Sequence, residues 1–140
     1  MNIVPLSFRR KLALEIARYA EKQKIEEHPL RQLFWECTLR CNLNCKHCGS
    51  DCKKTAGYAD MPKEDFLRVL DNIATKTDPH KVFVVVTGGE PLMRSDLEEC
   101  GKAIYERGFP WGMVTNGLAM TEERLNRLMA SGLHTATVRR

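Results

Sequence analysis

Residues 81–91 read KVFVVVTGGEP, a run of apolar residues that ends in two glycines. The β-branched stretch from Val82 to Thr87 favours a strand, and its lack of polar alternation is typical of a strand buried on both faces of a parallel sheet. The two glycines allow the backbone to approach a ligand closely and to expose its carbonyls. This stretch therefore predicts a parallel α/β protein with a loop of functional interest at residues 88–94.

Helices and strands alternate on both sides of this strand. The sequence predicts strands at residues 32–37, 81–87, 111–115 and 134–138, and connecting helices at residues 62–77, 95–108 and 121–132. Ser95 and Glu98 have the spacing of a capping box at the start of the second connecting helix. Helical connections between parallel strands are right-handed, and functional loops in such folds follow the carboxyl ends of the strands. Residues 38–60, 88–94 and 115–120 are therefore expected to meet along one rim.

A further helix is predicted before the sheet, over residues 6–27. Its narrow apolar stripe consists of Leu12, Ile16, Tyr19 and Ala20. Basic side chains cover much of the remaining surface, at Arg9, Arg10, Lys11, Arg18, Lys22 and Lys24. We expect this helix to pack as a lid on the following domain with its basic face in water. A helix that lies on a membrane or on RNA is the alternative interpretation.

Composition narrows the class of protein. The chain has 140 residues and a mass of 16.0 kDa, which is the size of one ordinary domain, and 43% of its residues are hydrophobic. The net charge of +4 is too small to indicate a nucleic-acid partner. Residues 1–11 lack the apolar segment of a secretory signal, and no apolar run reaches the length of a membrane span. We therefore expect a cytoplasmic protein without membrane contact.

Six cysteines are many for a chain of this length, and five of them lie between Cys37 and Cys52. In a reducing compartment clustered cysteines are typical metal ligands rather than disulfides. A zinc site on Cys37, Cys41, Cys45 and Cys48 is one candidate, although only three residues separate its two pairs and leave little chain to wrap a tetrahedral ion. Closely spaced thiolates on one loop suit the irons of an iron–sulfur cluster better.

The spacing Cys41-x3-Cys45-x2-Cys48 resembles the signature of the radical S-adenosylmethionine (radical SAM) superfamily. This resemblance implies that the three thiolates hold three irons of a [4Fe–4S] cluster and that S-adenosylmethionine chelates the fourth. It also implies an external electron donor, flavodoxin-like or ferredoxin-like. Reductive cleavage of the cofactor then yields a 5′-deoxyadenosyl radical that abstracts a hydrogen atom from the substrate.

Two more segments resemble motifs of the same family. The motif that binds the methionine amino group is matched by Gly88, Gly89, Glu90 and Pro91. The segment 115–117 (Thr-Asn-Gly) resembles another family motif and implies a ligand-facing Asn116, although Asn-Gly is equally an ordinary turn. His47 occupies the position before the last cysteine, where family members place a residue whose backbone meets the adenine.

The remaining cysteines and one carboxylate have structural interpretations. Cys37 is expected to be a small residue at a strand end, and Cys52 an additional thiol rather than a fourth ligand that would exclude S-adenosylmethionine. Cys100 is expected to be buried in a helix. Glu36 alternates with Trp35 on the first strand, so it either points into the barrel or forms a structural salt bridge.

The family fold is usually a partial (β/α)6 barrel, and this chain supplies about four of its βα units. The predicted organisation is an N-terminal helical extension at residues 1–29 and an incomplete radical SAM core at residues 30–140. Residues 33–52 most resemble the peptide-maturase (SPASM) branch, which implies a peptide substrate, whereas an RNA-modifying radical enzyme is an alternative. The open edge of the fourth strand predicts that the 140 residues alone aggregate and cleave the cofactor slowly.

The colour of the protein distinguishes a cluster from zinc. After anaerobic incubation with iron and sulfide, we expect a brown protein with broad visible absorption, because thiolate-bound iron and sulfide absorb visible light. The measurement is an absorption spectrum together with metal analysis. A colourless protein that retains stoichiometric zinc would instead support the zinc-binding module.

Overall fold

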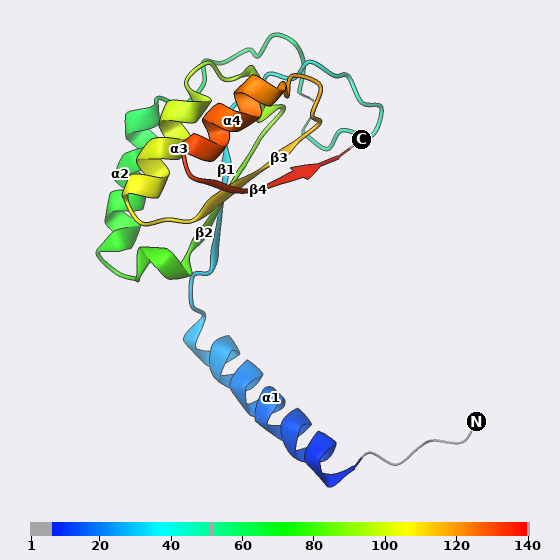
Figure 1. The fold of residues 1–140 in the computed structure, drawn as a ribbon, viewed down its shortest axis with the longest axis vertical. Coiled ribbons are helices and arrows are strands. Elements are labelled where there is room, and N and C mark those ends of the chain that lie inside the picture. The colour runs from blue at the N-terminus through cyan, green and yellow to red at the C-terminus, as the bar shows by residue number, and fades with distance from the viewer. Residues whose placement is uncertain (1–6, 51, 140) are drawn as a thin grey trace, which may run out of the picture.

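The computed structural model describes residues 7–50 and 52–139, and Figure 1 shows their arrangement. The helices and strands follow one another as α1 (Phe8–Glu27), β1 (Gln32–Glu36), α2 (Lys63–Ala74), β2 (Phe83–Thr87), α3 (Leu97–Glu106), β3 (Trp111–Thr115), α4 (Glu122–Ala130) and β4 (Leu133–Val138). Short 3-10 turns at Pro79–Lys81 and Pro91–Met93 flank β2. The predicted alternation of strands and helices is confirmed.

The four strands form one parallel sheet in the order β1-β2-β3-β4. Helices α2, α3 and α4 all cover the same face of this sheet, as Figure 1 shows. Successive right-handed crossovers onto one face curve a parallel sheet toward a barrel, whereas a doubly wound sheet has helices on both faces. The architecture therefore places the carboxyl ends of all four strands on one rim.

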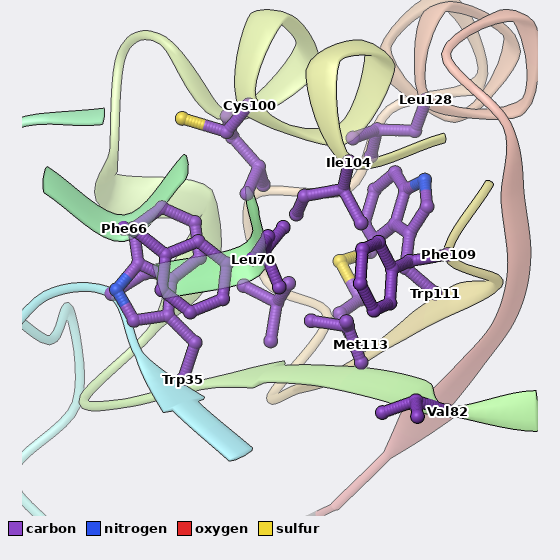
Figure 2. Close-up of a cluster of buried hydrophobic side chains, with 14 of the residues drawn as sticks. Trp35, Phe66, Leu70, Val82, Cys100, Ile104, Phe109, Trp111, Met113 and Leu128 are labelled. Atoms are coloured by element: carbon purple, nitrogen blue, oxygen red, sulfur yellow. The ribbon is translucent and has the colours of Figure 1, made fainter. Parts of the chain in front are cut away.

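The core lies between the sheet and the three helices, and Figure 2 shows part of it. The ring of Trp35 on β1 stacks on Phe66 of α2, with 4.0 Å between ring centroids and 3° between ring planes. Further along the sheet, Trp111 and Met113 of β3 lie in the same buried cluster as Ile104 of α3. The helix layer is thus anchored by alternate residues of β1, β2 and β3, whereas β4 is largely exposed.

The opposite face of the sheet is less covered than the sequence predicts. Val84 and Val86 of β2 are fully buried under the helices, but Phe83 and Val85 on the other face are half-buried. Beside them, 63% of the surface of Phe34 on β1 is exposed. The expectation of a strand buried on both faces is wrong for the described residues, because all three crossover helices pack on one side.

The start of α3 also differs from the prediction. Asp96, not Ser95, is the residue that precedes the helix, and no side chain caps it. Arg94 engages both oxygens of the Asp96 carboxylate, at 2.7 Å and 3.0 Å, and Glu98 pairs with Arg124 of α4 at 3.2 Å. The expected capping box is wrong because Asp96 is the N-cap and Glu98 pairs with Arg124 of α4. The predicted start of α4 is confirmed, since Thr121 caps that helix.

Helix α1 begins at Phe8, and every side chain of its first fifteen residues is exposed. Tyr19, a member of the expected stripe, has 66% of its surface exposed. The expected lid that packs on the core is therefore wrong for the described residues. Leu14 and Ile25 lie off the stripe and are also exposed, so the apolar side chains do not gather on a single face. None of the described helices has the length and apolar character needed to cross a membrane.

Gly101 on α3 faces Trp111 of β3, and a Cβ added there would overlap the indole ring. Gly101→Ala is therefore expected to lower the free energy of unfolding by about 1–3 kcal/mol, because the ring and the helix must separate. Urea unfolding of the metal-free protein measures this change. Gly57→Ala is the matched control, because a Cβ at Gly57 meets nothing within 4 Å. Equal stability of the two variants would contradict the packing argument.

Candidate functional site

Hydrogen bonds between backbones join the loops that follow β1 and β2. The N–H of Gly89 donates to the carbonyl of Thr38 at 2.8 Å, and the N–H of Glu90 donates to the carbonyl of Arg40 at 2.8 Å. The cysteine loop and the Gly-Gly-Glu-Pro loop are therefore side by side from their first residues. This arrangement confirms the predicted convergence of loops on the rim of the sheet.

The two glycines make this contact sterically feasible. A Cβ at Gly88 would overlap the carbonyl oxygen of Thr38, and one at Gly89 would overlap that of Arg40. Gly88 also has a φ of 133°, a conformation that side chains with a Cβ rarely adopt. The groups that these glycines approach most closely are thus backbone carbonyls of the same chain. This close approach determines where the turn lies beside the cysteine loop.

A pocket of about 520 Å³ opens where the loops meet. Of the residues predicted from sequence, those that line it are Cys41, Cys45, His47, Cys48, Gly88, Gly89 and Asn116. The pocket is also lined by residues that were not predicted as site residues, namely Leu43, Lys46, Thr87, Val114, Thr115 and Arg139. The position of Thr87, Val114 and Thr115 at the carboxyl ends of strands was the available signal. Glu90 and Pro91 do not line the pocket and are buried.

The three predicted cluster ligands differ in depth. The side chain of Cys41 lies at the base of the pocket with 8% of its surface exposed, whereas Cys45 and Cys48 are exposed. The N–H of Cys48 donates to the carbonyl of Cys45 at 3.2 Å and forms a tight turn. Within residues 7–50 and 52–139, no three His, Cys, Asp or Glu side chains are gathered closely enough to hold one metal ion.

The base of the cysteine loop is anchored by a second segment. The N–H of Cys41 donates to the carbonyl of Lys53 at 2.8 Å, and Arg40 forms an ion pair with Asp60. Burial raises the pKa of the Asp60 carboxyl, but hydrogen bonds from Thr38 and Arg40 outweigh that effect and leave the pKa below its ordinary value. Asp60 is therefore ionised near neutral pH and holds the returning end of the loop.

The other cysteines lie outside the pocket. Burial raises the pKa of the Cys37 thiol to about 12, against the opposing effect of Arg94, and burial likewise raises the pKa of Cys100 to about 12. Cys52 is buried, with its Cβ close to the position that a Cβ on Gly89 would take. Metal ligands are thiolates, so a fully buried Cys37 with a raised pKa is a poor ligand. The four cysteines of the zinc alternative are not brought together.

The donor set of the pocket fits an iron–sulfur cluster. Its lining includes three thiols and no carboxylate. Iron–sulfur clusters are held by cysteine thiolates, and a loop that offers three of them leaves one iron without a protein ligand. Structural zinc instead requires four protein ligands. Cys37 of the zinc alternative does not line this pocket, so a zinc ion on the other three cysteines would need the exposed His47 as its fourth ligand.

The carboxylate of Glu90 is fully buried and has three donors. Its Oε1 accepts from the N–H of Leu92 at 3.0 Å and from the hydroxyl of Thr115 at 2.7 Å, and its Oε2 accepts from the N–H of Asn116 at 2.7 Å. This carboxylate joins the end of β2 to the end of β3. Within the predicted motif, Gly88 and Gly89 line the pocket, whereas Glu90 does not.

Two other predicted residues have different surroundings. His47 is exposed at the pocket, in the position that the motif gives it. Glu36 is exposed on the face of β1 opposite Trp35, where it points away from the helix layer. Glu36 forms no salt bridge with another described residue, so the expected structural ion pair is absent from this part of the chain.

Comparison with known proteins places this geometry in a family. A sequence profile of the Radical SAM superfamily matches residues 35–138, which include the cysteine loop, the glycine turn and strands β2 to β4. The chain belongs to the radical SAM superfamily. Membership implies a [4Fe–4S] cluster and S-adenosylmethionine as cofactors, in agreement with the thiol set of the pocket.

Relatives within the superfamily catalyse different reactions. The chain is 30% identical to the AdoMet-dependent heme synthase of Methanosarcina barkeri (strain Fusaro / DSM 804) over 77% of its own length and 30% of that enzyme. It is 31% identical to the PqqA peptide cyclase of Rhizobium meliloti (strain 1021) over 84% of its length and 31% of that enzyme. The chain thus spans less than a third of the length of these curated relatives.

Solved structures share the fold at low sequence identity. BtrN in complex with AdoMet and 2-DOIA superposes with a TM-score of 0.64 and 20% identity, over 79% of this chain and 45% of BtrN. Streptococcus suis SuiB bound to S-adenosylmethionine gives a TM-score of 0.62 and 20% identity, over 99% of this chain and 32% of SuiB. The four parallel strands therefore correspond to part of a radical SAM barrel.

Replacing Glu90 tests whether it joins the loops. Glu90→Ala should lower the free energy of unfolding by roughly 2–5 kcal/mol, because the Thr115 hydroxyl and two backbone N–H groups lose their buried acceptor. Urea unfolding of the metal-free protein measures the loss. Glu36→Ala is the control on an exposed carboxylate and should change stability by less than about 0.5 kcal/mol. A Glu90 variant as stable as this control would rule out the structural role.

Proposed function

We propose that this protein is a radical SAM enzyme, in which Cys41, Cys45 and Cys48 hold a [4Fe–4S] cluster. The observation that carries the proposal is the single pocket in which three thiols face a glycine turn. The three thiols differ in exposure to solvent. A cluster held by all three would have Cys41 on its buried side and Cys45 and Cys48 on its solvent side. Cys37, Cys52 and Cys100 remain packing residues in this proposal.

Different residues of the pocket are proposed to bind the two ends of S-adenosylmethionine. Gly88 and Gly89 present backbone polar atoms beside the cysteines, and we assign to them the methionine end of S-adenosylmethionine. His47 and the neighbouring cysteine loop take the adenine end. When bound, the cluster and its cofactor supply one-electron cleavage of a sulfonium and a 5′-deoxyadenosyl radical that abstracts hydrogen. The chain's contribution is to bind and orient the cofactor and to exclude water from it.

An electron donor and a substrate complete the proposed reaction. The exposed thiols of Cys45 and Cys48 lie on the solvent side of the pocket, where an external flavodoxin-like or ferredoxin-like donor has access. We propose a peptide substrate, supported by the similarity to PqqA peptide cyclase and by the fold shared with SuiB, which has been solved bound to the precursor peptide SuiA. The partly exposed sheet face that carries Phe34 is the surface on which such a chain would lie.

Iron counting after single substitutions tests the proposed ligand set. Ala in place of Cys41, Cys45 or Cys48 should abolish stable cluster uptake, because each thiolate holds one iron. Ala in place of Cys37, Cys52 or Cys100 should leave the iron and sulfide content unchanged. These three buried cysteines are matched controls for the loss of a thiol. Loss of the cluster on replacing Cys37 or Cys52, with Cys41→Ala unaffected, would overturn the assignment.

A further inference from the structure

The side-chain amide of Asn116 has an orientation that its neighbours determine. Its Oδ1 accepts a hydrogen bond from the backbone N–H of Leu118 at 2.9 Å. A backbone N–H can only donate, so the amide oxygen faces Leu118 and the amide nitrogen faces the other way. The backbone N–H of Asn116 donates to Glu90 at 2.7 Å and holds the residue at the end of β3.

The amide nitrogen of Asn116 faces the cysteine loop. Its Nδ2 donates to Oδ1 of Asn42 at 2.8 Å and lies 3.9 Å from the Sγ of Cys41, a long contact to sulfur. The two hydrogens of this nitrogen serve the two acceptors. The backbone N–H of Leu43 also donates to the Sγ of Cys41, at 3.4 Å. Two N–H groups therefore converge on the most buried of the three ligand thiols.

We propose that Asn116 raises the reduction potential of the cluster by donating its Nδ2–H to the Sγ of Cys41. This inference rests on the proposed function, because it requires a cluster on Cys41. One-electron reduction by the external donor adds negative charge that is shared by the cluster and its thiolate ligands, and no protein bond forms or breaks. A hydrogen bond to a ligand sulfur stabilises that added charge, and hydrogen bonds to sulfur are among the factors that set cluster potentials.

The position of Asn116 makes this effect specific to one corner of the cluster. Cys41 is nearly buried, so water competes little with the amide for its sulfur, whereas Cys45 and Cys48 are exposed to solvent. Hydrogen bonds in a shielded environment have a larger electrostatic effect than those in water. Glu90 contributes indirectly as a positioning residue, since its carboxylate holds the Asn116 backbone.

The midpoint potential of the reconstituted cluster tests the inference. Asn116→Asp keeps an oxygen for the Leu118 N–H but loses the Nδ2–H, and Asn116→Leu removes the donor without adding charge. Both variants should shift the potential to more negative values in an EPR-monitored redox titration, with unchanged iron content. Asn44→Asp is the matched control for charge. It adds the same negative charge to the cysteine loop, but Asn44 lines a separate pocket that does not include Asn116. An Asn116→Leu variant with the wild-type potential would overturn the proposal.

A second measurement needs no substitution. In wild-type protein that carries 15N only in asparagine side-chain amides, pulsed EPR of the reduced cluster should detect a 15N hyperfine coupling. Absence of any such coupling would overturn the proposal even if the Asn116 variants fail to fold. Wild-type protein that takes up no cluster would overturn the proposed function itself, whereas a normal cluster without an Asn116 effect would overturn this inference alone.

Discussion

The close approach of the Gly88–Gly89 turn to the backbone of residues 38–40 is the contact on which the rim depends. Two backbone hydrogen bonds join these segments, and any side chain at either glycine would collide with a carbonyl group. Loops that connect different strands are thereby held in one register before any cofactor binds. The Glu90 carboxylate extends the same connection to the end of β3. These contacts fix the part of the pocket that Gly88 and Gly89 line.

Burial and pocket lining together separate the six cysteines into two groups. Cys37 and Cys100 lie in the core, where burial keeps the thiols protonated, and their contribution is to packing. Cys41 lies at the boundary between core and pocket, while Cys45 and Cys48 are in contact with solvent. Cys52 is also buried, with 5% of its surface exposed against 8% for Cys41, but it does not line the pocket. The three cysteines of the spacing motif are therefore the three that line the pocket.

Most of the architecture could be predicted from the sequence because it depends on local patterns. The apolar run before Gly88 predicts a strand, and Thr121 predicts a helix start, since both signals act within a few residues. The features that were missed depend on contacts between distant residues. Glu98 does not complete a capping box with Ser95 because it pairs with Arg124, 26 residues away on α4. The contacts of Glu90 with the end of β3 likewise join residues 25 and 26 positions apart, beyond the reach of a motif.

Helix α1 has a different source of stability from the rest of the chain. Its first fifteen side chains are exposed, so tertiary packing adds little to the free energy of its helical state. An isolated helix of about 20 residues is marginally stable in water, and its helicity depends on temperature and length. The helix–coil equilibrium of α1 is therefore separate from the cooperative unfolding of the sheet and its three helices. Heating should melt α1 gradually, below the temperature at which the core unfolds.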